Sequence, residues 1–398
     1  MRLSSVGEIN IQTLKHLAVV TSNYPSPGQP THGTFVREFV RAVAKRNVEV
    51  SVIAPIARHR ARDSSAFPIR EQISANQSGQ IQVFRPRYLS VSAWNRLKFM
   101  GNLNPSRITY LGFLKAVQKT ITSNRLNPTA LYGHFLYMSG ATAVGIGTKW
   151  NIPAFPCVGE GEMWTLERFG LKTAQRDLKN AKGFIANNSF LGSFISESLG
   201  FEDQPKIILP NGCDLTRFKP LNKVDCRKYF GLPDKTFLVC SIGNFSYKKG
   251  IARTAEAIRD LPNVAGVFAG AGPETPACEN IAFCGKVKHD EIPRLLNACD
   301  AFVLPTLVEG SCNAIVEAIA CGLPIISSNY PFNDDLLDDS MSIKIDPLSI
   351  DEIRKAIHML SSNTSLQNSM SANSLAKSKS LDVNIRAEKI VSFIESQL

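Results

Sequence analysis

Two glutamates eight positions apart are the strongest candidates for a functional role in this chain. Glu309 stands in a polar loop, and Glu317 stands inside the apolar stretch Ala-Ile-Val-Glu-Ala-Ile-Ala. A carboxylate inside an apolar helix needs a partner, because an unpaired buried charge is costly. That partner is either a ligand hydroxyl or a structural hydrogen bond within the protein.

The segments around this pair predict a βαβ unit. Residues 301–304 form an apolar run typical of a buried parallel strand, and residues 323–326 restart a strand after the helix. Glu309 and the helix start then lie at the carboxyl edge of the sheet, where open α/β sheets bind ligands. Backbone N–H groups of residues 311–313 face the same edge and suit a phosphate.

Apolar strand-like runs alternate with helical stretches along the whole chain, which predicts an α/β protein with parallel sheets covered by helices on both faces. A length of 398 residues with 44% hydrophobic content is enough for two cores. The turn signal Pro210-Asn-Gly212 and a charged connector over residues 214–234 place the boundary between an N-terminal domain, 1–215, and a second domain, 216–380. Residues 381–398 have a helical pattern, and we expect this helix to cross back onto the first domain.

Several protein classes are excluded by what the sequence lacks. No apolar run approaches the roughly 20 residues of a membrane-spanning helix, and residues 1–10 have no apolar core of a signal peptide. The nine cysteines contain no Cys-x-x-Cys pair, so we expect reduced thiols in the cytoplasm and neither a zinc site nor a disulfide framework. The Gly-x-Gly-x-x-Gly fingerprint of nicotinamide enzymes is absent after the first strand.

The net charge of +11 is placed unevenly. Residues 1–215 hold 25 basic and 13 acidic side chains (+12), whereas residues 216–398 hold 20 and 21 (−1). Residues 58–125 carry twelve Lys and Arg against Asp63 and Glu71. Such a segment attracts polyanions, meaning an anionic membrane surface, a phosphorylated lipid or nucleic acid. A solvated basic face that only aids solubility is the equal alternative.

Five motifs together resemble the retaining GT-B glycosyltransferases, specifically glycosyltransferase family 4, over nearly the whole chain. Residues 33–40 look like the family's first loop and helix, and residues 209–220 are similar to its interdomain signature. Residues 241–250 look like its diphosphate-binding strand and loop, and residues 284–287 stand in place of its nucleobase-contacting loop. The stretch from 309 to 317 matches its paired-glutamate motif, the most specific of the five. The resemblance implies two Rossmann-like domains facing across a cleft.

The resemblance also implies roles for single residues. Glu309 would hold hydroxyls of the donor sugar, Glu317 would hold the ribose, and Lys249 would neutralise the diphosphate; Lys249 and Glu309 are therefore the expected catalytic residues. Backbone groups at Lys286 and Val287 would contact the base. The donor-binding residues expected in this way are Gly33, Asn244, Lys248, Lys286, Val287, Gly310, Ser311, Cys312, Asn313 and Glu317.

Two positions depart from the family pattern. The family usually has an arginine straight after the glycine of its phosphate-binding loop, and this chain has Asn244. Neutralisation of the leaving diphosphate would then fall to Lys249 and its neighbour Lys248. Many relatives also have a histidine before the glycine of the loop after the fifth strand, and Val158 stands there. The residues expected near the acceptor are His134, Glu160 and Glu162.

The chemistry of a nucleotide sugar explains why these residue types are required. Breaking its glycosidic bond concentrates negative charge on a phosphate oxygen, so positive charge and N–H dipoles must be in place there. A metal would need a carboxylate cluster such as Asp-x-Asp, and none follows a predicted strand; we therefore expect no divalent metal and no cofactor. A simple hydrolase with two carboxylates would have no use for a phosphate-binding loop with two lysines.

The sequence thus predicts a retaining glycosyltransferase that moves a sugar from a nucleotide-diphosphate donor, expected to be UDP-linked, to a hydroxyl of a glycan or lipid-linked acceptor in bacterial surface polysaccharide synthesis. The basic segment 58–125 suggests peripheral association with the inner face of the plasma membrane, and nucleic acid is not the expected partner. Two alternatives stay open. One is a sugar-nucleotide epimerase that hydrolyses its donor, and the other is a non-catalytic basic protein that binds membranes or nucleic acid.

Overall fold

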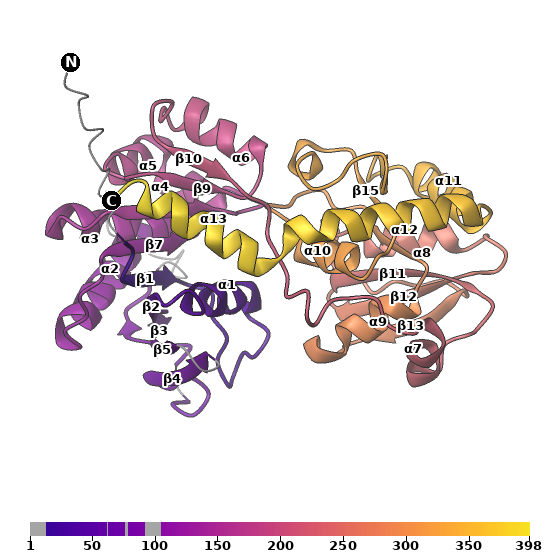
Figure 1. The fold of residues 1–398 in the computed structure, drawn as a ribbon, viewed down its shortest axis with the longest axis horizontal. Helices are drawn as coiled ribbons and strands as arrows, with labels where there is room; N and C mark the ends of the chain where they lie inside the picture. Colours follow the sequence, from indigo (N-terminus) through magenta and orange to yellow (C-terminus); the bar gives the residue numbers. More distant parts are fainter. Residues whose placement is uncertain (1–12, 62, 76–78, 92–104) are drawn as a thin grey trace, which may run out of the picture.

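Two lobes, each built on a parallel sheet, lie side by side in the computed structural model (Figure 1). The structure describes residues 13–398 apart from 62, 76–78 and 92–104. The first sheet lies within residues 16–208 and the second within residues 237–345. Helices α12 and α13 form one long path that runs from the second lobe back across the first (Figure 1).

The first sheet has eight strands in the order β10-β9-β8-β7-β1-β2-β5-β4, and all neighbours are parallel except β4 and β5. Its strands are β1 (His16–Thr21), β2 (Glu49–Ile53), β4 (Arg70–Ala75), β5 (Gly79–Phe84), β7 (Ala130–His134), β8 (Ala154–Val158), β9 (Phe184–Ala186) and β10 (Lys206–Ile208). The short strands β3 (Ile56–Ala57) and β6 (Arg87–Tyr88) pair separately. The helices of this half are α1 (Thr34–Ala44), α2 (Pro105–Ser123), η1 (Leu136–Gly140), α3 (Ala141–Trp150), α4 (Trp164–Phe169), α5 (Leu171–Leu178), α6 (Ser189–Ser193) and η2 (Phe194–Ser198).

The residues of β1 suit a central strand because their side chains enter the cores on both faces of the sheet. Leu17 and Val19 pack into the core beneath α1 and α13, whereas Ala18 and Val20 pack on the opposite face beneath α2 and α3. Side chains alternate between the two faces of a strand. Because both faces are covered, residues 17–20 are all apolar, as in other buried parallel strands.

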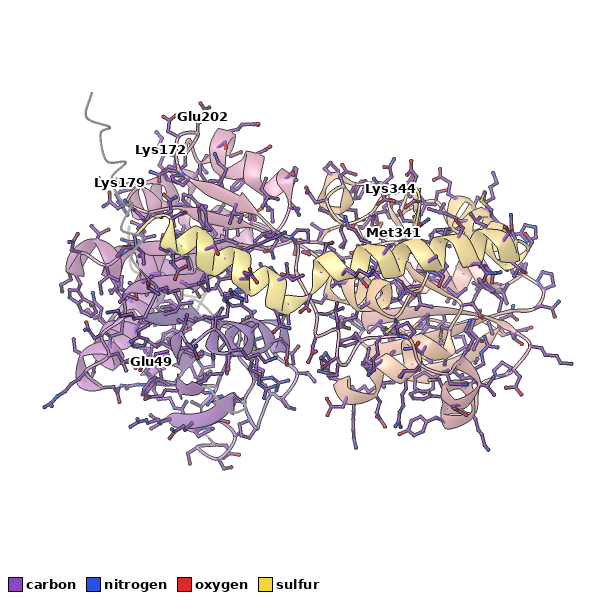
Figure 2. The ribbon with its side chains drawn as sticks, in the orientation of Figure 1. Glu49, Lys172, Lys179, Glu202, Met341 and Lys344 are labelled. Carbon is purple, nitrogen blue, oxygen red and sulfur yellow. The ribbon has the colours of Figure 1, made fainter. Side chains whose placement is uncertain are left out.

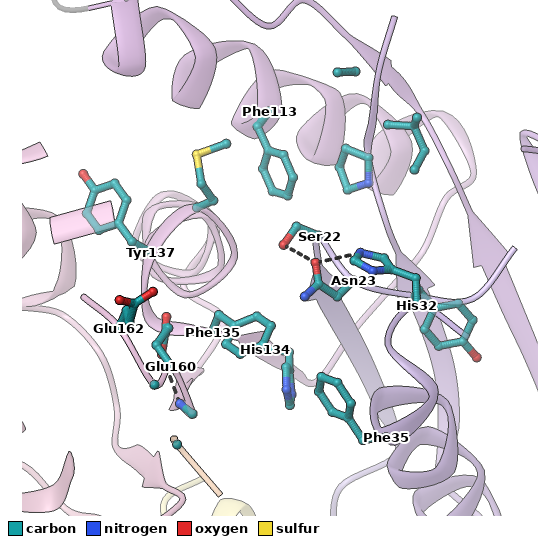
Figure 3. Close-up of a pocket in the computed structure, with 18 of the residues that line it drawn as sticks. Ser22, Asn23, His32, Phe35, Phe113, His134, Phe135, Tyr137, Glu160 and Glu162 are labelled. Carbon is teal, nitrogen blue, oxygen red and sulfur yellow. Dashed lines mark hydrogen bonds between the residues drawn. The ribbon is translucent and has the colours of Figure 1, made fainter. Parts of the chain in front are cut away.

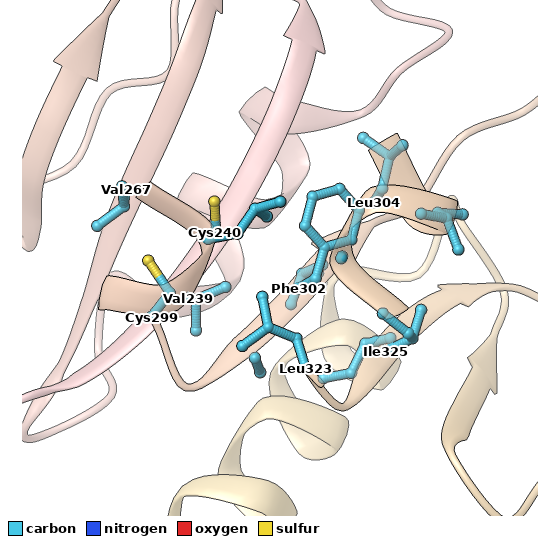
Figure 4. Packing of buried hydrophobic residues seen from close by; sticks show 14 of the residues in the cluster. Val239, Cys240, Val267, Cys299, Phe302, Leu304, Leu323 and Ile325 are labelled. Atoms are coloured by element: carbon cyan, nitrogen blue, oxygen red, sulfur yellow. The ribbon is translucent and has the colours of Figure 1, made fainter. Parts of the chain in front are cut away.

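The second sheet has six parallel strands in the order β13-β12-β11-β14-β15-β16. Its strands are β11 (Phe237–Asn244), β12 (Val264–Ala271), β13 (Ile281–Gly285), β14 (Ala301–Leu304), β15 (Ile325–Ser328) and β16 (Ser342–Ile345). The order reverses between β11 and β14, as in doubly wound nucleotide-binding sheets, and ligands bind outside the carboxyl ends of strands at such a point. Figure 4 shows side chains such as Val239, Phe302 and Ile325 filling the core of this half.

The helices of the second half are α7 (Lys223–Phe230), α8 (Ile251–Ile258), η3 (His289–Glu291), α9 (Ile292–Ala298), α10 (Asn313–Ala320), η4 (Pro331–Asn333), α11 (Ile350–Ser361), α12 (Thr364–Ser378) and η5 (Lys379–Leu381). Helix α7 falls within the predicted connector 214–234, so this segment is not only a linker. It is helical because the Asn222 side chain caps its first turn and Cys226 and Arg227 are buried on its inner side.

The chain crosses between the lobes twice, and the two crossings touch. Cys213 on the outward path and Asp382 on the return path form a parallel β-bridge. After this point α13 (Val383–Glu395) packs against α1, and Ile390 and Ile394 enter the core of the first half.

The predicted fold class, an α/β GT-B arrangement with a returning C-terminal helix, is confirmed. The strands predicted from apolar runs are present in both halves, whereas β3, β4, β6 and β13 lie outside those runs. Strand β4 was missed because it is an antiparallel edge strand with polar residues such as Arg70 and Gln72. The predicted boundary after residue 215 falls between β10 and α7 and stays a prediction.

In the described part of the chain, every helix is too short or too polar to span a bilayer. All nine cysteines are free thiols. Charged side chains such as Lys172, Lys179 and Glu202 project outward from the first lobe (Figure 2).

Candidate active site

The carboxyl ends of strands from both sheets meet at one cavity of about 710 Å³. Its lining includes Asn23 after β1, the segment after β7, Gly159 to Glu162 after β8, and Glu309 to Ser311 after β14. Figure 3 shows the first-half side of this cavity, where His134, Tyr137 and Glu160 gather around the open space. Two halves of the chain therefore contribute to one site.

Lys249 and Glu309 form an ion pair beside this cavity. The lysine and glutamate side chains are 27% and 13% exposed, and Glu309 also accepts a hydrogen bond of 3.3 Å from the Thr306 hydroxyl. Burial disfavours the charge on Lys249, but its neighbours Cys312 and Glu309 raise its pKa above the ordinary value. Burial also raises the pKa of Cys312 to about 12, so that thiol is neutral at pH 7 and Glu309 is the partner of the cation.

The start of helix α10 supplies backbone donors next to this pair. Gly310, Ser311 and Asn313 line the cavity, whereas Cys312 is buried. The side chain of Cys312, at the N-cap, accepts no hydrogen bond from the first turn. Uncapped N–H groups and the positive end of the helix dipole favour an anion at this place.

Glu317 faces a smaller cavity of about 30 Å³ that is lined by Thr34, Phe35 and residues of the 212–218 segment. Its carboxylate lies 3.4 Å from Nε2 of His289. Arg217 donates to Nδ1 of His289 at 2.8 Å, so the neutral ring has its proton on Nε2, toward Glu317. Glu317 therefore has a structural partner and is also open to a small space between the lobes.

Gly33 begins α1 beside this smaller cavity. Its φ of 76° lies in the left-handed region, and a methyl group there would overlap the carbonyl oxygen of Asn23. Only glycine fits this turn.

Glu160 follows β8 and lines the large cavity from the first half of the chain. Its carboxylate accepts backbone hydrogen bonds from Leu136 at 2.5 Å and from Gly159 at 3.0 Å. Burial outweighs these hydrogen bonds and raises the pKa of Glu160 to about 7. A carboxyl group with this pKa exchanges a proton near neutral pH, which is the property of a general acid or base.

His134 is buried at the end of β7 and also lines the large cavity. Burial, and then the charge of Arg386, lower the pKa of His134 to about 3. Tyr132 contacts its Nδ1 at 2.9 Å. The ring is therefore a neutral hydrogen-bonding group, and next to it Phe135 has an unusual φ of 76°, the kind of backbone strain that clusters at functional sites.

Glu162 and Lys248 form a second ion pair, and it joins the two lobes across the cleft. Both side chains are about half exposed. The sequence placed Glu162 with the acceptor and Lys248 with the donor, and the structure brings them together.

Six residues predicted for the donor site line neither of these cavities. They are Gly33, Asn244, Lys248, Lys286, Val287 and Cys312. Asn244 is exposed at the end of β11, and Lys286 and Val287 follow β13. The roles given to the predicted site residues stay predictions.

Sequence reasoning missed several residues that hold the site together. Asn187 and Asn188 follow β9, and Asn211 was explained only by its turn. All three are buried and hydrogen-bonded. A pair of amides directly after a buried strand was the available signal, whereas nothing in the pattern of α13 singled out Arg386, which contacts Asn187.

The basic segment 58–125 has fewer free cations than its sequence suggests. Arg85 is buried, 2.8 Å from Glu71, and Arg107 pairs with Asp177. Arg62, Arg96 and Lys98 lie outside the described residues. Exposed Arg58 and Arg60 remain near the cavity, and Arg60 lines it.

Among the residues that the structure describes, no group of three or more His, Cys, Asp or Glu side chains is placed to hold a metal ion.

Residues 223–377 match the family model for glycosyl transferases group 1. The chain is 27% identical over 352 residues, covering 85% of this chain and 87% of the relative, to a Bacillus subtilis protein named as a teichuronic acid biosynthesis glycosyltransferase, TuaC. It is 32% identical over 157 residues to the Escherichia coli UDP-Gal:alpha-D-GlcNAc-diphosphoundecaprenol alpha-1,3-galactosyltransferase, over 34% of this chain and 40% of that protein.

Among solved structures, sucrose-phosphate synthase from Thermosynechococcus elongatus has the same fold, with a TM-score of 0.76 over 96% of this chain and 99% of that one, at 15% identity. The match to the glycosyl transferases group 1 model lies within the second half of the chain. Glycosyltransferase homologues support glycosyl transfer as the class of activity.

Proposed function

We propose that this protein transfers a sugar from a UDP-sugar to a hydroxyl of a glycan or lipid-linked acceptor, with retention of anomeric configuration. The second half would bind the donor and the first half the acceptor. The observation behind the proposal is the Lys249–Glu309 pair beside uncapped N–H groups of α10, at the edge of a cavity of about 710 Å³ between two doubly wound sheets.

The chemistry follows from the charges at this place. A diphosphate bound beside the start of α10 would draw the Lys249 ammonium from Glu309, and the cation would then stabilise the leaving phosphate oxygen. The released Glu309 carboxylate would accept hydrogen bonds from sugar hydroxyls. Lys248, paired with exposed Glu162, would supply a second charge in place of the arginine that Asn244 replaces.

On the acceptor side, the cavity offers both apolar and cationic lining. Tyr88, Phe113 and Phe169 supply aromatic surface, and Arg60 and Arg168 supply positive charge. This combination suits an acceptor with a phosphate and an apolar part, in line with the diphosphoundecaprenol in the name of one relative. We place the reaction in bacterial surface polysaccharide synthesis, at the inner face of the plasma membrane.

The membrane part of the proposal has its own test. The protein should float with liposomes that contain anionic lipid, and the bound fraction should fall as salt rises, because exposed charges are screened over roughly 10 Å at 0.1 M ionic strength. Equal flotation with neutral and anionic liposomes would refute it.

We also propose that transfer needs no divalent metal, since two lysines and helix dipoles would neutralise the diphosphate. Transfer rates should therefore be the same in EDTA and in Mg²⁺. Loss of activity in EDTA that Mg²⁺ restores would contradict this part.

The central experiment is a thermal-shift screen of nucleotides and UDP-sugars, because a ligand of the native state raises its stability by mass action. Donors that bind are then incubated with lipid-linked acceptors, and NMR of the product gives its anomeric configuration. Rapid, stoichiometric loss of the donor without acceptor would favour the epimerase alternative. Absence of any nucleotide binding would end the proposal.

A further inference from the structure

The donor loop, which we define as residues 310–313, is held from outside the second sheet by asparagines. Nδ2 of Asn188 donates to the Gly310 carbonyl at 2.5 Å. The backbone N–H of Asn211 donates to the Ser311 hydroxyl at 2.9 Å, and its Nδ2 donates to the Ser311 carbonyl and to Oδ1 of Asn313, both at 3.0 Å. Gly310, Ser311 and Asn313 are thus each held by a hydrogen bond from an asparagine.

The amide of Asn211 is in turn fixed by a relay that starts in the last helix. Arg386 in α13 donates to Oδ1 of Asn187 at 2.9 Å, and Nδ2 of Asn187 donates to Oδ1 of Asn211 at 3.2 Å. Arg386 also donates to the Pro210 carbonyl at 2.9 Å. All three side chains are at least nine-tenths buried.

The chemistry of arginine sets the direction of this relay. A guanidinium has only donors, so Asn187 must present its oxygen to Arg386 and its NH₂ group to Asn211. Asn211 must then present its oxygen to Asn187 and its NH₂ group to the donor loop. One buried cation therefore determines the orientation of both amides.

We infer that Asn211 is a positioning residue for the donor loop and that Arg386, through Asn187, holds Asn211 in the required orientation. For the nature of the ligand, this inference rests on the proposed function. Backbone donors stabilise a phosphate only when they are held in place before it arrives. The relay makes the returning helix α13 part of the support of the donor site.

The isosteric variant Asn211→Asp tests the inference. It keeps the oxygen that faces Asn187, but it places a carboxylate oxygen against the Ser311 carbonyl and Oδ1 of Asn313. We expect faster hydrogen exchange of the backbone amides of residues 310–316 and an increase of about tenfold in the Kd of UDP, the size of effect that loss of buried hydrogen bonds gives. The KM for the acceptor should not change.

Asp335→Ala is the matched control. Asp335 accepts hydrogen bonds from the backbone N–H of Ser189 at 2.6 Å and from its hydroxyl at 2.7 Å, so its removal also cuts two bonds between the lobes without touching the donor loop. Exchange in residues 310–316 and the Kd of UDP should stay as in the wild type. If Asp335→Ala has the same effect as Asn211→Asp, or if Asn211→Asp has none, the inference is overturned.

A second variant covers the case in which Asn211→Asp does not fold. Arg386→Lys keeps the charge but cannot reach Asn187 and Pro210 together, and it should increase exchange in residues 310–316 by a smaller factor. Unchanged exchange in that segment would refute the relay. A wild-type protein that binds no nucleotide would instead refute the proposed function, and the exchange measurement would still test the positioning role.

Discussion

At the scale of single residues, both lysines of the phosphate-binding loop are paired with carboxylates. Lys249 and Glu309 are mostly buried, whereas Lys248 and Glu162 are about half exposed. Breaking the buried pair should therefore lower the unfolding free energy more than breaking the exposed pair. Burial weakens screening by water and raises the cost of leaving one charge without its partner.

The variant Lys249→Met should lower kcat/KM about 100-fold, because one preorganised positive group at the leaving phosphate is lost. It should also lower the unfolding free energy by about 3 kcal/mol, since Glu309 is left as an uncompensated charge. Adding Glu309→Gln should restore much of the stability in urea unfolding and none of the activity. Lys248→Met, which breaks the exposed pair, should cost about 0–1 kcal/mol; equal losses from both single variants would contradict the difference in burial.

Glu160 should make stability depend on pH. Its folded pKa of about 7 lies above its ordinary value of 4.5, so the fold favours the protonated form. The contribution of this preference to the unfolding free energy is fully present below pH 4.5 and is lost as the pH rises through 7. Urea unfolding at pH 5, 6, 7 and 8 should show the wild type losing stability relative to Glu160→Gln. A difference that stays constant over this range would show that Glu160 titrates normally.

At the scale of elements, the site depends on two glycine-containing loops that touch across the cleft. A methyl group on Gly310 would overlap the carbonyl oxygen of Gly159, and one on Gly161 would lie about 3.1 Å from the backbone of Glu309. Neither loop can move away freely, because Asn188 and Asn211 hold the donor loop and Glu160 accepts a hydrogen bond from the backbone N–H of Leu136 in η1.

Gly310→Ala should therefore push the two loops apart. We expect a loss of about 1–3 kcal/mol in unfolding free energy, as for other overpacked sites, together with a fall in transfer activity. The control is Gly145→Ala in helix α3, where an added methyl group would make only ordinary contacts with Leu114 and Tyr110. Wild-type stability and activity in Gly310→Ala would mean that the loops adapt more easily than their contacts indicate.

Strands buried on both faces could be predicted from the sequence, whereas a polar edge strand could not. A run such as residues 301–304 was predicted with the same bounds as β14 because a strand buried on both faces must be apolar throughout. The polar edge strand β4 left no such signal. Lys249 and Glu309 were assigned to one site by the family resemblance of the motifs that contain them. The contacts of Glu162 with Lys248 and of Asn211 with Ser311 depend on how the two lobes dock, which no local pattern encodes.

At the scale of the whole molecule, the first half is completed by a helix from the other end of the chain. Val383, Ala387, Ile390 and Ile394 of α13 belong to the same core as α1 and β1. The connection between the lobes is narrow, because its outward and return paths meet at Cys213 and Asp382. If the lobes rotated about this point, the parts of the cleft farthest from Cys213 and Asp382 would change their separation most.

Ile390→Ala should lower the unfolding free energy by about 2–5 kcal/mol, as for other large-to-small changes at fully buried sites. Ile385→Ala on the same helix is the control, because Ile385 is 37% exposed and its removal should cost much less. Urea unfolding of the two variants measures the difference. Similar, small losses would show that α13 contributes little to the first lobe.

The return of α13 has a consequence for protein synthesis. Residues 383–394 leave the ribosome after the whole second lobe has been made, so for most of translation the apolar face that they cover in the first lobe is open to water. Exposed faces of this kind promote aggregation of incomplete chains. We therefore expect chains that stop before residue 383 to aggregate more readily than the full chain.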